Sequence, residues 1–284
     1  MTGRRHEAAG MAILALSLVV AGCSTSEATR STGELETAGA AETTTATATA
    51  AGATATAERL AGRYAHYDVV AYESADMKTL IISYGFTDLQ VDNGVLMAQE
   101  SFCHAEHRSD QPIETTISDA ATSAIKPPSV AVTLTEQDGR TRLQRPETPT
   151  GIGIRLEDPA HDVLPTDPND PRIADDDNDG KPGITVSIKV SDALQGELYI
   201  ARRERFAYDV TEEAGQLVGT VTDKSEQLIV GASDPMFVTD APWVQVPDLS
   251  KSPIVLEKVS DQSDCEWLAA QRADLFGEPP VVGW

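Results

Sequence analysis

The segment Ile184-Thr185-Val186-Ser187-Ile188-Lys189-Val190 alternates apolar and polar residues from end to end. This period of two predicts a β-strand with one buried face and one exposed face. Upstream, Asn93-Gly94 separates two apolar runs at residues 86–91 and 95–103. Asn-Gly favours a two-residue hairpin, because both turn positions need a positive φ. Strands joined in this way pair antiparallel, so we expect the chain to build an antiparallel sheet.

Similar short runs recur along the chain between turn-forming residues. They lie at residues 67–72, 79–84, 130–134, 140–143, 197–200, 206–210, 216–221, 227–230 and 254–259. Asp138-Gly139 and Asp223-Lys224 are expected to form two further hairpins, the second between the strands 216–221 and 227–230. Helical patterns are expected at residues 118–125 and 264–276, with Ser118 and either Ser263 or Asp264 as the N-cap residues.

Many short strands with hairpin turns, and no alternation of strands with helices, predict an all-β domain. We expect an antiparallel β-barrel or β-sandwich with a short C-terminal helix. The barrel is favoured, because consecutive hairpins build an up-and-down, lipocalin-like meander.

The first 23 residues carry the signals of export. Arg4 and Arg5 precede a stretch of fifteen residues, 8–22, that is almost entirely apolar. A helix needs about 20 apolar residues to span a bilayer, so this stretch is short for a membrane span and suits a signal peptide. Val20-Ala21-Gly22-Cys23 resembles the lipobox of bacterial lipoproteins. An uncleaved membrane anchor or a buried core helix is the alternative.

The lipobox resemblance implies a location. Cleavage after Gly22 would remove residues 1–22 and leave Cys23 as a lipid-modified amino terminus. We therefore expect the protein at the cell envelope, attached to a membrane through this lipid. Residue 24 is Ser and not Asp, which implies the outer membrane if the cell is Gram-negative.

A segment of low complexity lies between this cysteine and the predicted strands. Residues 23–57 consist mostly of Thr, Ala, Ser, Gly and Glu. They bury too little apolar surface to offset the entropy lost on ordering, so we expect a flexible tether with a root-mean-square reach of about 30 Å. Residues 58–284 are then a single β-rich domain, which is long enough for a sizeable core.

The chain is strongly acidic, with a formal net charge of −23 at pH 7. Such a surface repels phosphate backbones, so nucleic acid is not expected as a partner. The same charge favours cations, basic partners or solubility alone.

Two cysteines remain once Cys23 is assigned to lipid. Cys103 and Cys265 form an even pair in a chain that is expected to be exported. Because oxidising compartments allow such pairs to form disulfides, we predict a bond between them. Two unrelated buried thiols are the alternative.

Residues 157–181 carry nine carboxylates and include the run Asp175-Asp176-Asp177-Asn178-Asp179-Gly180. This run resembles the DxDxDG calcium loop of EF-hands, dockerin modules and thrombospondin-type repeats. Alternate carboxylates, followed by a glycine that allows a sharp turn, can surround one hard cation with oxygen ligands. The resemblance implies side-chain ligands from Asp175, Asp177 and Asp179, a carbonyl ligand from Lys181, and Ca²⁺ in a structural role.

The match to this loop is incomplete. Val186 takes the position of the bidentate glutamate, and Gly183 offers no side chain at the ninth position. Further ligands are expected from Asp162, Asp167 or Asp170, or from water. A solvated acidic loop without an ion is the alternative.

A longer motif includes the same aspartates. With the residues that follow, they form a DxDxDGxPGxTV run that ends at Val186. In a β-rich chain with one cysteine on an early strand and another near the carboxyl end, this run resembles a group of bacterial lipoproteins of unknown function. The resemblance covers most of residues 58–270 and implies no activity.

Catalytic motifs are weak, and we assign no catalytic residue. His104 and His107 flank Glu106, but residues three apart on a strand point to opposite faces and cannot easily share a zinc ion. Ser233 lacks the second glycine of a nucleophile elbow. We expect a binding or structural module rather than an enzyme, with a small apolar ligand or an envelope protein as its partner. The alternative is an envelope hydrolase with catalytic residues on its loops.

Overall fold

The structure is a computed structural model that describes residues 52–74, 77–137, 139–238 and 243–284. The predicted signal peptide at residues 1–22, the lipid-modified Cys23 and most of the expected tether lie outside these residues. Within the described ranges, no helix combines the length and the apolar composition that a membrane crossing requires.

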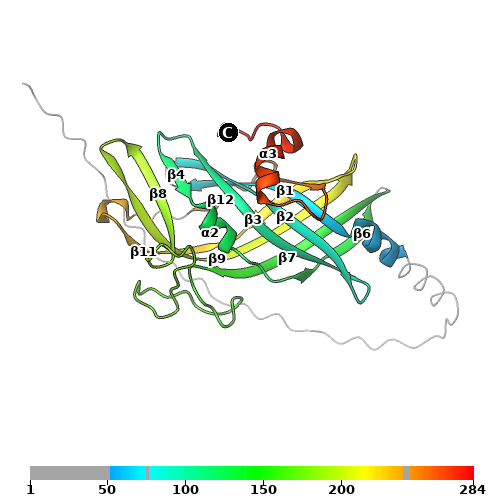
Figure 1. Cartoon of the computed structure of the whole chain (residues 1–284), viewed down its shortest axis with the longest axis horizontal. Helices are drawn as coiled ribbons and strands as arrows, with labels where there is room; N and C mark the ends of the chain where they lie inside the picture. Colours follow the sequence, from blue (N-terminus) through cyan, green and yellow to red (C-terminus); the bar gives the residue numbers. More distant parts are fainter. Residues whose placement is uncertain (1–51, 75–76, 138, 239–242) are drawn as a thin grey trace, which may run out of the picture. The chain divides into compact units, whose positions relative to one another are not determined.

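The described residues build a 13-stranded antiparallel sheet that is curled into a half-barrel (Figure 1). The strands are β1 (Gly62–Ser74), β2 (Met77–Asp92), β3 (Val95–Ser109), β4 (Glu114–Ile117), β5 (Val130–Ala131), β6 (Thr133–Gln137), β7 (Arg140–Ile152), β8 (Ile184–Ser191), β9 (Leu194–Glu213), β10 (Gln216–Asp223), β11 (Glu226–Ala232), β12 (Val244–Gln245) and β13 (Pro253–Lys258). The helices α2 (Asp119–Ala124) and α3 (Cys265–Phe276) and the 3-10 turns η1 (Pro235–Phe237) and η2 (Leu249–Lys251) lie among and after them. The predicted all-β class, antiparallel pairing and C-terminal helix are confirmed.

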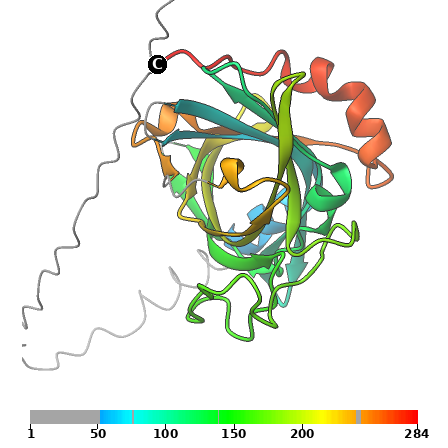
Figure 2. The same ribbon diagram turned by 90° about the vertical axis from the view of Figure 1, so that its left-hand side faces the viewer.

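One bent segment connects the two borders of the curl. β5 pairs with β3 while β6 pairs with β7, and only Val132 separates β5 from β6. At this joint the Val132 backbone N–H donates to the Leu96 carbonyl at 2.9 Å. Figure 2 shows the strands arranged around a common interior. The curl therefore agrees with the barrel that consecutive hairpins favoured over a sandwich.

The hairpins are confirmed in part. Asn93 and Gly94 have φ values of 49° and 80° and join β2 to β3. Asp138 lies outside the described residues, but β6 and β7 pair on its two sides as predicted. The predicted pairing of β10 with β11 is wrong, because β11 pairs with β9. β10 already has β9 at one edge and β13 at the other, so no edge remains for β11.

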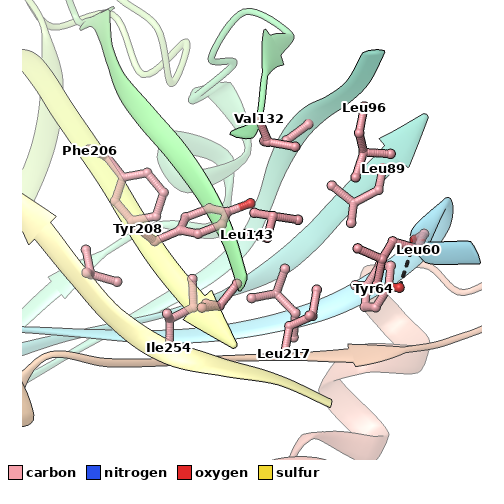
Figure 3. Packing of buried hydrophobic residues seen from close by; sticks show 14 of the residues in the cluster. Leu60, Tyr64, Leu89, Leu96, Val132, Leu143, Phe206, Tyr208, Leu217 and Ile254 are labelled. Carbon is pink, nitrogen blue, oxygen red and sulfur yellow. Dashed lines mark hydrogen bonds between the residues drawn. The ribbon is translucent and has the colours of Figure 1, made fainter. Parts of the chain in front are cut away.

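Apolar side chains fill one end of the interior (Figure 3). Residues 52–60 are helical and add Ala57 and Leu60 to this cluster, with exposed fractions of only 2% and 3%. The Tyr64 hydroxyl donates to the Leu60 carbonyl at 2.8 Å and links the helix to β1. The domain thus begins before the expected boundary at residue 58. A Thr-Ala-rich segment is a weak helix alone, but packing against the sheet stabilises it here.

The outer face of β1 and β2 is covered by α3 and the residues that follow it (Figure 1). The Asp264 side chain accepts from the Trp267 N–H at 2.8 Å, so Asp264 and not Ser263 is the N-cap residue. The predicted Cys103–Cys265 disulfide is confirmed and joins β3 to the start of α3, with its Cα atoms 5.4 Å apart. It closes a loop of 162 residues. In the chain-entropy model such a closure stabilises the fold by about 5 kcal/mol.

Candidate functional site

The acidic loop between β7 and β8 is attached to the sheet by apolar and polar contacts. Ile154 and Ile173 form an antiparallel bridge within the loop and pack against an apolar cluster on β9 and β11. Asp176 accepts from the Gly153 N–H at 2.6 Å and pairs with Arg155 at 2.5 Å. These contacts join the end of the loop to the residues that follow β7, so the loop has a defined path.

Three carboxylates come together near the end of this loop. Asp175, Asp177 and Asp179 each provide an oxygen, and these oxygens all lie within 4.8 Å of one another. Calcium binds oxygens at 2.3–2.6 Å, so two oxygens on one ion can lie up to about 5 Å apart. The structure therefore groups the three residues that the sequence predicted as side-chain ligands. We call them the Asp triad.

Backbone N–H groups and one threonine hold the Asp triad in place. Asp175 accepts from the N–H groups of Asp179 and Gly180 at 3.1 and 2.9 Å. Thr185 donates its N–H to Asp177 at 2.9 Å and its hydroxyl to Asp179 at 2.5 Å. The hydroxyl bond lowers the pKa of Asp179, whereas burial raises the pKa of Asp177. Among the described residues, Asp177 Oδ1 is buried without a hydrogen-bond partner.

Positive φ values bend the loop around the Asp triad. Asn178 and Gly180 have φ values of 59° and 84°, and Gly183 follows at 82°. Gly183 lies against the backbone of Ile200, where a Cβ would collide with the Ile200 carbonyl. The missing side chain at the ninth position of the calcium-loop motif is therefore explained by close packing against β9.

Lys181 brings a positive charge to the Asp triad. Its Nζ lies 2.6 Å from Glu197 Oε2 and 3.6 Å from Asp179 Oδ2. The hydrogen bond to Glu197 raises the pKa of Lys181, so its ammonium group stays charged at neutral pH. This charge offsets part of the negative charge of the triad and competes with a bound cation. The sequence assigned only the Lys181 carbonyl to the ion.

The other acids that the sequence proposed as ligands have partners of their own. Asp170 pairs with Arg172 at 3.0 Å. Asp162 Oδ2 and Asp167 Oδ1 accept backbone N–H groups at 3.0 and 2.9 Å. Neither these two residues nor Asp170 joins the group of oxygens that the Asp triad forms.

A second concentration of charge lies inside the curl, and the sequence did not predict it. It occupies inward positions between the apolar cluster near residues 52–60 and another apolar cluster that includes Ile152 and Leu198. We call its eight charged or titratable residues the polar layer: Asp68, Glu100, Glu204, Asp223, Arg145, Arg202, His66 and His107.

Arg145 and Glu100 form the most buried ion pair of this layer. Arg145 donates to the two carboxylate oxygens of Glu100 at 2.8 and 3.0 Å, and both side chains are 1% exposed. Two backbone carbonyls accept further hydrogen bonds from Arg145. The pair is bidentate and every guanidinium nitrogen of Arg145 has a hydrogen-bond partner, which is the geometry that a buried charge requires.

Arg202 joins a looser group of acids. It lies 3.1 Å from Asp223 Oδ2 and 3.5 Å from Glu204 Oε2. The Tyr72 hydroxyl donates to Asp223 and links the group to β1. Burial raises the pKa of Glu204, with Arg202 opposing the shift. One guanidinium is thus shared between two carboxylates.

His104 and His107 lie on opposite sides of the sheet, as their spacing on β3 predicted. His104 bonds to Asp119 of α2 at 2.6 Å on the outer side. His107 faces the polar layer, where burial lowers its pKa to about 4. The two imidazoles therefore do not share a metal ion.

A pocket of about 360 Å³ opens beside β7 and β9. Arg145, Tyr208 and Asp209 line it together with smaller residues of β6, β7 and β10. Gln144 donates to Asp209 at 2.9 Å, and the Tyr208 hydroxyl lies 3.3 Å from a Glu100 oxygen. No serine, cysteine or histidine is among the residues that line the pocket.

The Asp triad and the polar layer differ in setting. The triad lies on a loop outside the sheet, where ions have access, whereas five of the eight residues of the layer are buried and the other three are partly buried. Comparisons of the chain with protein-family models, with curated proteins and with solved structures find no match in any of the three.

Proposed function

We propose that the protein is an exported, lipid-anchored β-domain with a binding or structural role, in which one Ca²⁺ ion braces the loop between β7 and β8. The Asp triad carries this proposal, because its oxygens lie within 4.8 Å of one another. Thr185 of β8 bonds to Asp177 and Asp179. An ion on the triad would therefore fix the end of the loop to the start of the strand.

The donor atoms support calcium over softer metals. Carboxylates and backbone carbonyls are hard oxygen ligands, which Ca²⁺ binds in six- to eightfold coordination, whereas Zn²⁺ prefers His and Cys. Mg²⁺ demands a near-ideal octahedron at shorter distances and gives up its water reluctantly. Asp177 Oδ1 also supports an ion, because a buried oxygen without a partner is destabilising until a ligand satisfies it.

The site is expected to be weak. It has three carboxylates where the EF-hand motif adds a bidentate glutamate, and the Lys181 ammonium lies 3.6 Å from Asp179. We expect a dissociation constant of about 0.1–1 mM, as in extracellular calcium modules. At a Ca²⁺ concentration ten times that constant, the ion would raise the free energy of unfolding by about 1.4 kcal/mol.

Isothermal titration of the full-length chain with CaCl₂ tests the proposal. Asp177→Asn keeps the shape of the side chain but removes the charge at the centre of the triad, so we expect binding to be lost. Asp167→Asn is the matched control, because Asp167 lies in the same loop, bonds to Asn169 and is outside the triad. Equal binding by wild type and Asp177→Asn, or no heat up to 10 mM Ca²⁺, would overturn the calcium site.

We further propose that Cys23 carries lipid and holds the domain at the cell envelope. The support is the lipobox Val20-Ala21-Gly22-Cys23 after a short apolar stretch. The intact mass of the native polypeptide should lack residues 1–22 and include added acyl chains, and Cys23→Ser should remove them. A native polypeptide that retains Met1 would contradict this.

The partner of the domain is proposed to be an envelope protein that binds outside the curl. Leu60, Leu143 and Leu217 belong to the apolar cluster that fills one end of the interior, which supports a surface partner over a small apolar ligand held inside. Stoichiometric binding of a fluorescent fatty acid by the purified chain would contradict this part of the proposal.

A further inference from the structure

Asp68 is a buried acid without a cation of its own. It lies on β1 in the polar layer and is 2% exposed. Ser83 on β2 donates a hydrogen bond to it, but Asp68 Oδ1 has no partner among the described residues. The two arginines of the layer are engaged by other carboxylates, since Arg145 binds Glu100 and Arg202 binds Asp223. A charge on Asp68 would therefore be buried and unpaired.

The strands around Asp68 add more negative charge. Glu204 on β9, Asp223 on β10 and Glu100 on β3 all act on it, and each disfavours a further charge. Arg145 and Arg202 are the positive groups on the facing strands β7 and β9. With Asp68 ionised, four carboxylates would face these two guanidinium groups. Burial raises the pKa of Asp68 well above its usual range and is the largest cause of the shift. The charge of Glu204 is the second cause.

His66 is a titratable neighbour of Asp68 that could take the proton in its place. Its Nε2 lies 3.9 Å from Asp68 Oδ1, and neither atom has a hydrogen-bond partner within the part of the chain that the structure describes. His66 Nδ1 lies 3.1 Å from the Thr87 hydroxyl. Burial and the nearby Arg145 charge lower the pKa of His66 to about 3, so the imidazole is neutral at neutral pH. A proton shared by this pair is therefore better held on the carboxyl group.

We propose that Asp68 is a neutral carboxylic acid in the folded protein at neutral pH, and that this proton makes the fold sensitive to alkaline conditions. Loss of the proton leaves a carboxylate beside Glu204, while the two guanidinium groups of the layer pair with Glu100 and Asp223. The polar layer is thus a pH-dependent element inside the curl, independent of the calcium site.

The direction of the pH effect follows from proton linkage. In the unfolded chain Asp68 ionises near its ordinary pKa of about 3.9. Between that pH and its raised folded-state pKa, the folded protein holds one more proton than the unfolded chain. The equilibrium constant for unfolding therefore increases about tenfold per pH unit for this proton. Glu204, whose pKa is also raised, acts in the same direction. His66 and His107 are neutral in the folded protein. In the unfolded chain each titrates at about pH 6.5, so they oppose the effect slightly near pH 7 and add little above about pH 8.

Urea unfolding of the full-length chain between pH 7 and pH 9 tests the proposal. The equilibrium constant for unfolding of the wild type should increase as the pH rises. In Asp68→Asn its increase per pH unit should be about tenfold smaller. The control is Asp192→Asn, because the Asp192 side chain is 98% exposed and should leave the pH dependence unchanged. The same pH dependence in wild type and Asp68→Asn would overturn the proposal.

A second measurement needs no variant, in case Asp68→Asn does not fold. The carboxyl ¹³C shift of Asp68 and the ring ¹⁵N shifts of His66 report the proton directly by NMR. At pH 7 we expect the shift of a protonated acid at Asp68 and of a neutral imidazole at His66. A carboxylate at Asp68, with or without an imidazolium at His66, would overturn the proposal.

Discussion

At the end of the curl that carries the helix at residues 52–60, the strands point leucine, valine and tyrosine side chains inward. A few residues further along the same strands, they point arginine, histidine and carboxylate groups inward. On β7 the change takes two residues, from Leu143 in the apolar cluster to Arg145 in the polar layer. Both regions are buried, so the difference lies in how each residue is stabilised.

The apolar end tolerates approximate packing, whereas the polar layer depends on specific partners. A buried leucine gains from any close contact, because dispersion and the hydrophobic effect have no direction. A buried arginine is stable only when its charge is paired and its donors are bonded, as Arg145 is with Glu100. Removing one partner from the layer should therefore be more damaging than removing atoms from the apolar end.

The largest effect is expected from Arg145→Met. The substitution keeps much of the side-chain volume but leaves Glu100, 1% exposed, as an unpaired buried charge. We expect the free energy of unfolding to fall by about 3–5 kcal/mol in urea titrations at pH 7. The double variant Arg145→Met/Glu100→Met should recover most of the loss, and a double variant no more stable than Arg145→Met would contradict the pairing.

A smaller effect, about 3 kcal/mol, is expected from Leu143→Ala. Leu143 is fully buried in the apolar cluster, so the substitution removes its contacts and leaves a cavity. Because no titratable group is uncovered, the loss should be equal at pH 5 and pH 8 in the same urea titrations. A loss that changes with pH would mean that the apolar cluster and the polar layer are energetically coupled along β7, where only Gln144 separates Leu143 from Arg145.

The smallest effect is expected from Arg142→Met. Arg142 of β7 pairs with Asp209 of β9 on the outer side of the sheet, and their side chains are 36% and 33% exposed. Solvent screens such a pair, so we expect a loss below about 1 kcal/mol that declines further in 0.5 M NaCl. A loss as large as that of Arg145→Met would show that burial does not explain the difference between the two arginines.

The same contrast explains where sequence patterns predicted the strands well and where they failed. Residues 197–200 and 206–210 were expected as two strands, but both belong to β9. Between them lies Ala-Arg-Arg-Glu-Arg at residues 201–205. Arg202 and Glu204 face the polar layer, and Arg203 pairs with Glu226 on the outer side. With charges on both faces, the apolar alternation that marks a strand disappears.

β3 and β7 are longer than expected for the same reason. β3 was expected to end at Cys103 and continues to Ser109, with His107 among its inward positions. β7 was expected to end at Leu143 and continues to Ile152 beyond Arg145 and a bulge. In each case the residues just beyond the expected end are mostly polar or charged, so the apolar alternation stops there.

The Asp triad was predicted more completely than the polar layer. The spacing of Asp175, Asp177 and Asp179 is local, so a few backbone turns bring their oxygens together. The motif did not predict that Thr185 of β8 donates hydrogen bonds to Asp177 and Asp179. It also did not predict that Gly183 is needed for close packing against β9, because both features depend on the neighbouring strands.

Local patterns in the sequence determined the β class, the hairpin at Asn93-Gly94, the Ser118 cap and the carboxylate spacing, because these depend on residues a few positions apart. The disulfide was also predictable, since Cys103 and Cys265 are the one pair that remains when Cys23 is assigned to lipid. The tertiary structure alone decided that β11 pairs with β9, that residues 52–60 close the apolar end, and that the polar layer forms. Each of these depends on contacts between distant segments, such as Arg145 with Glu100, whose energy comes from burial that no local pattern records.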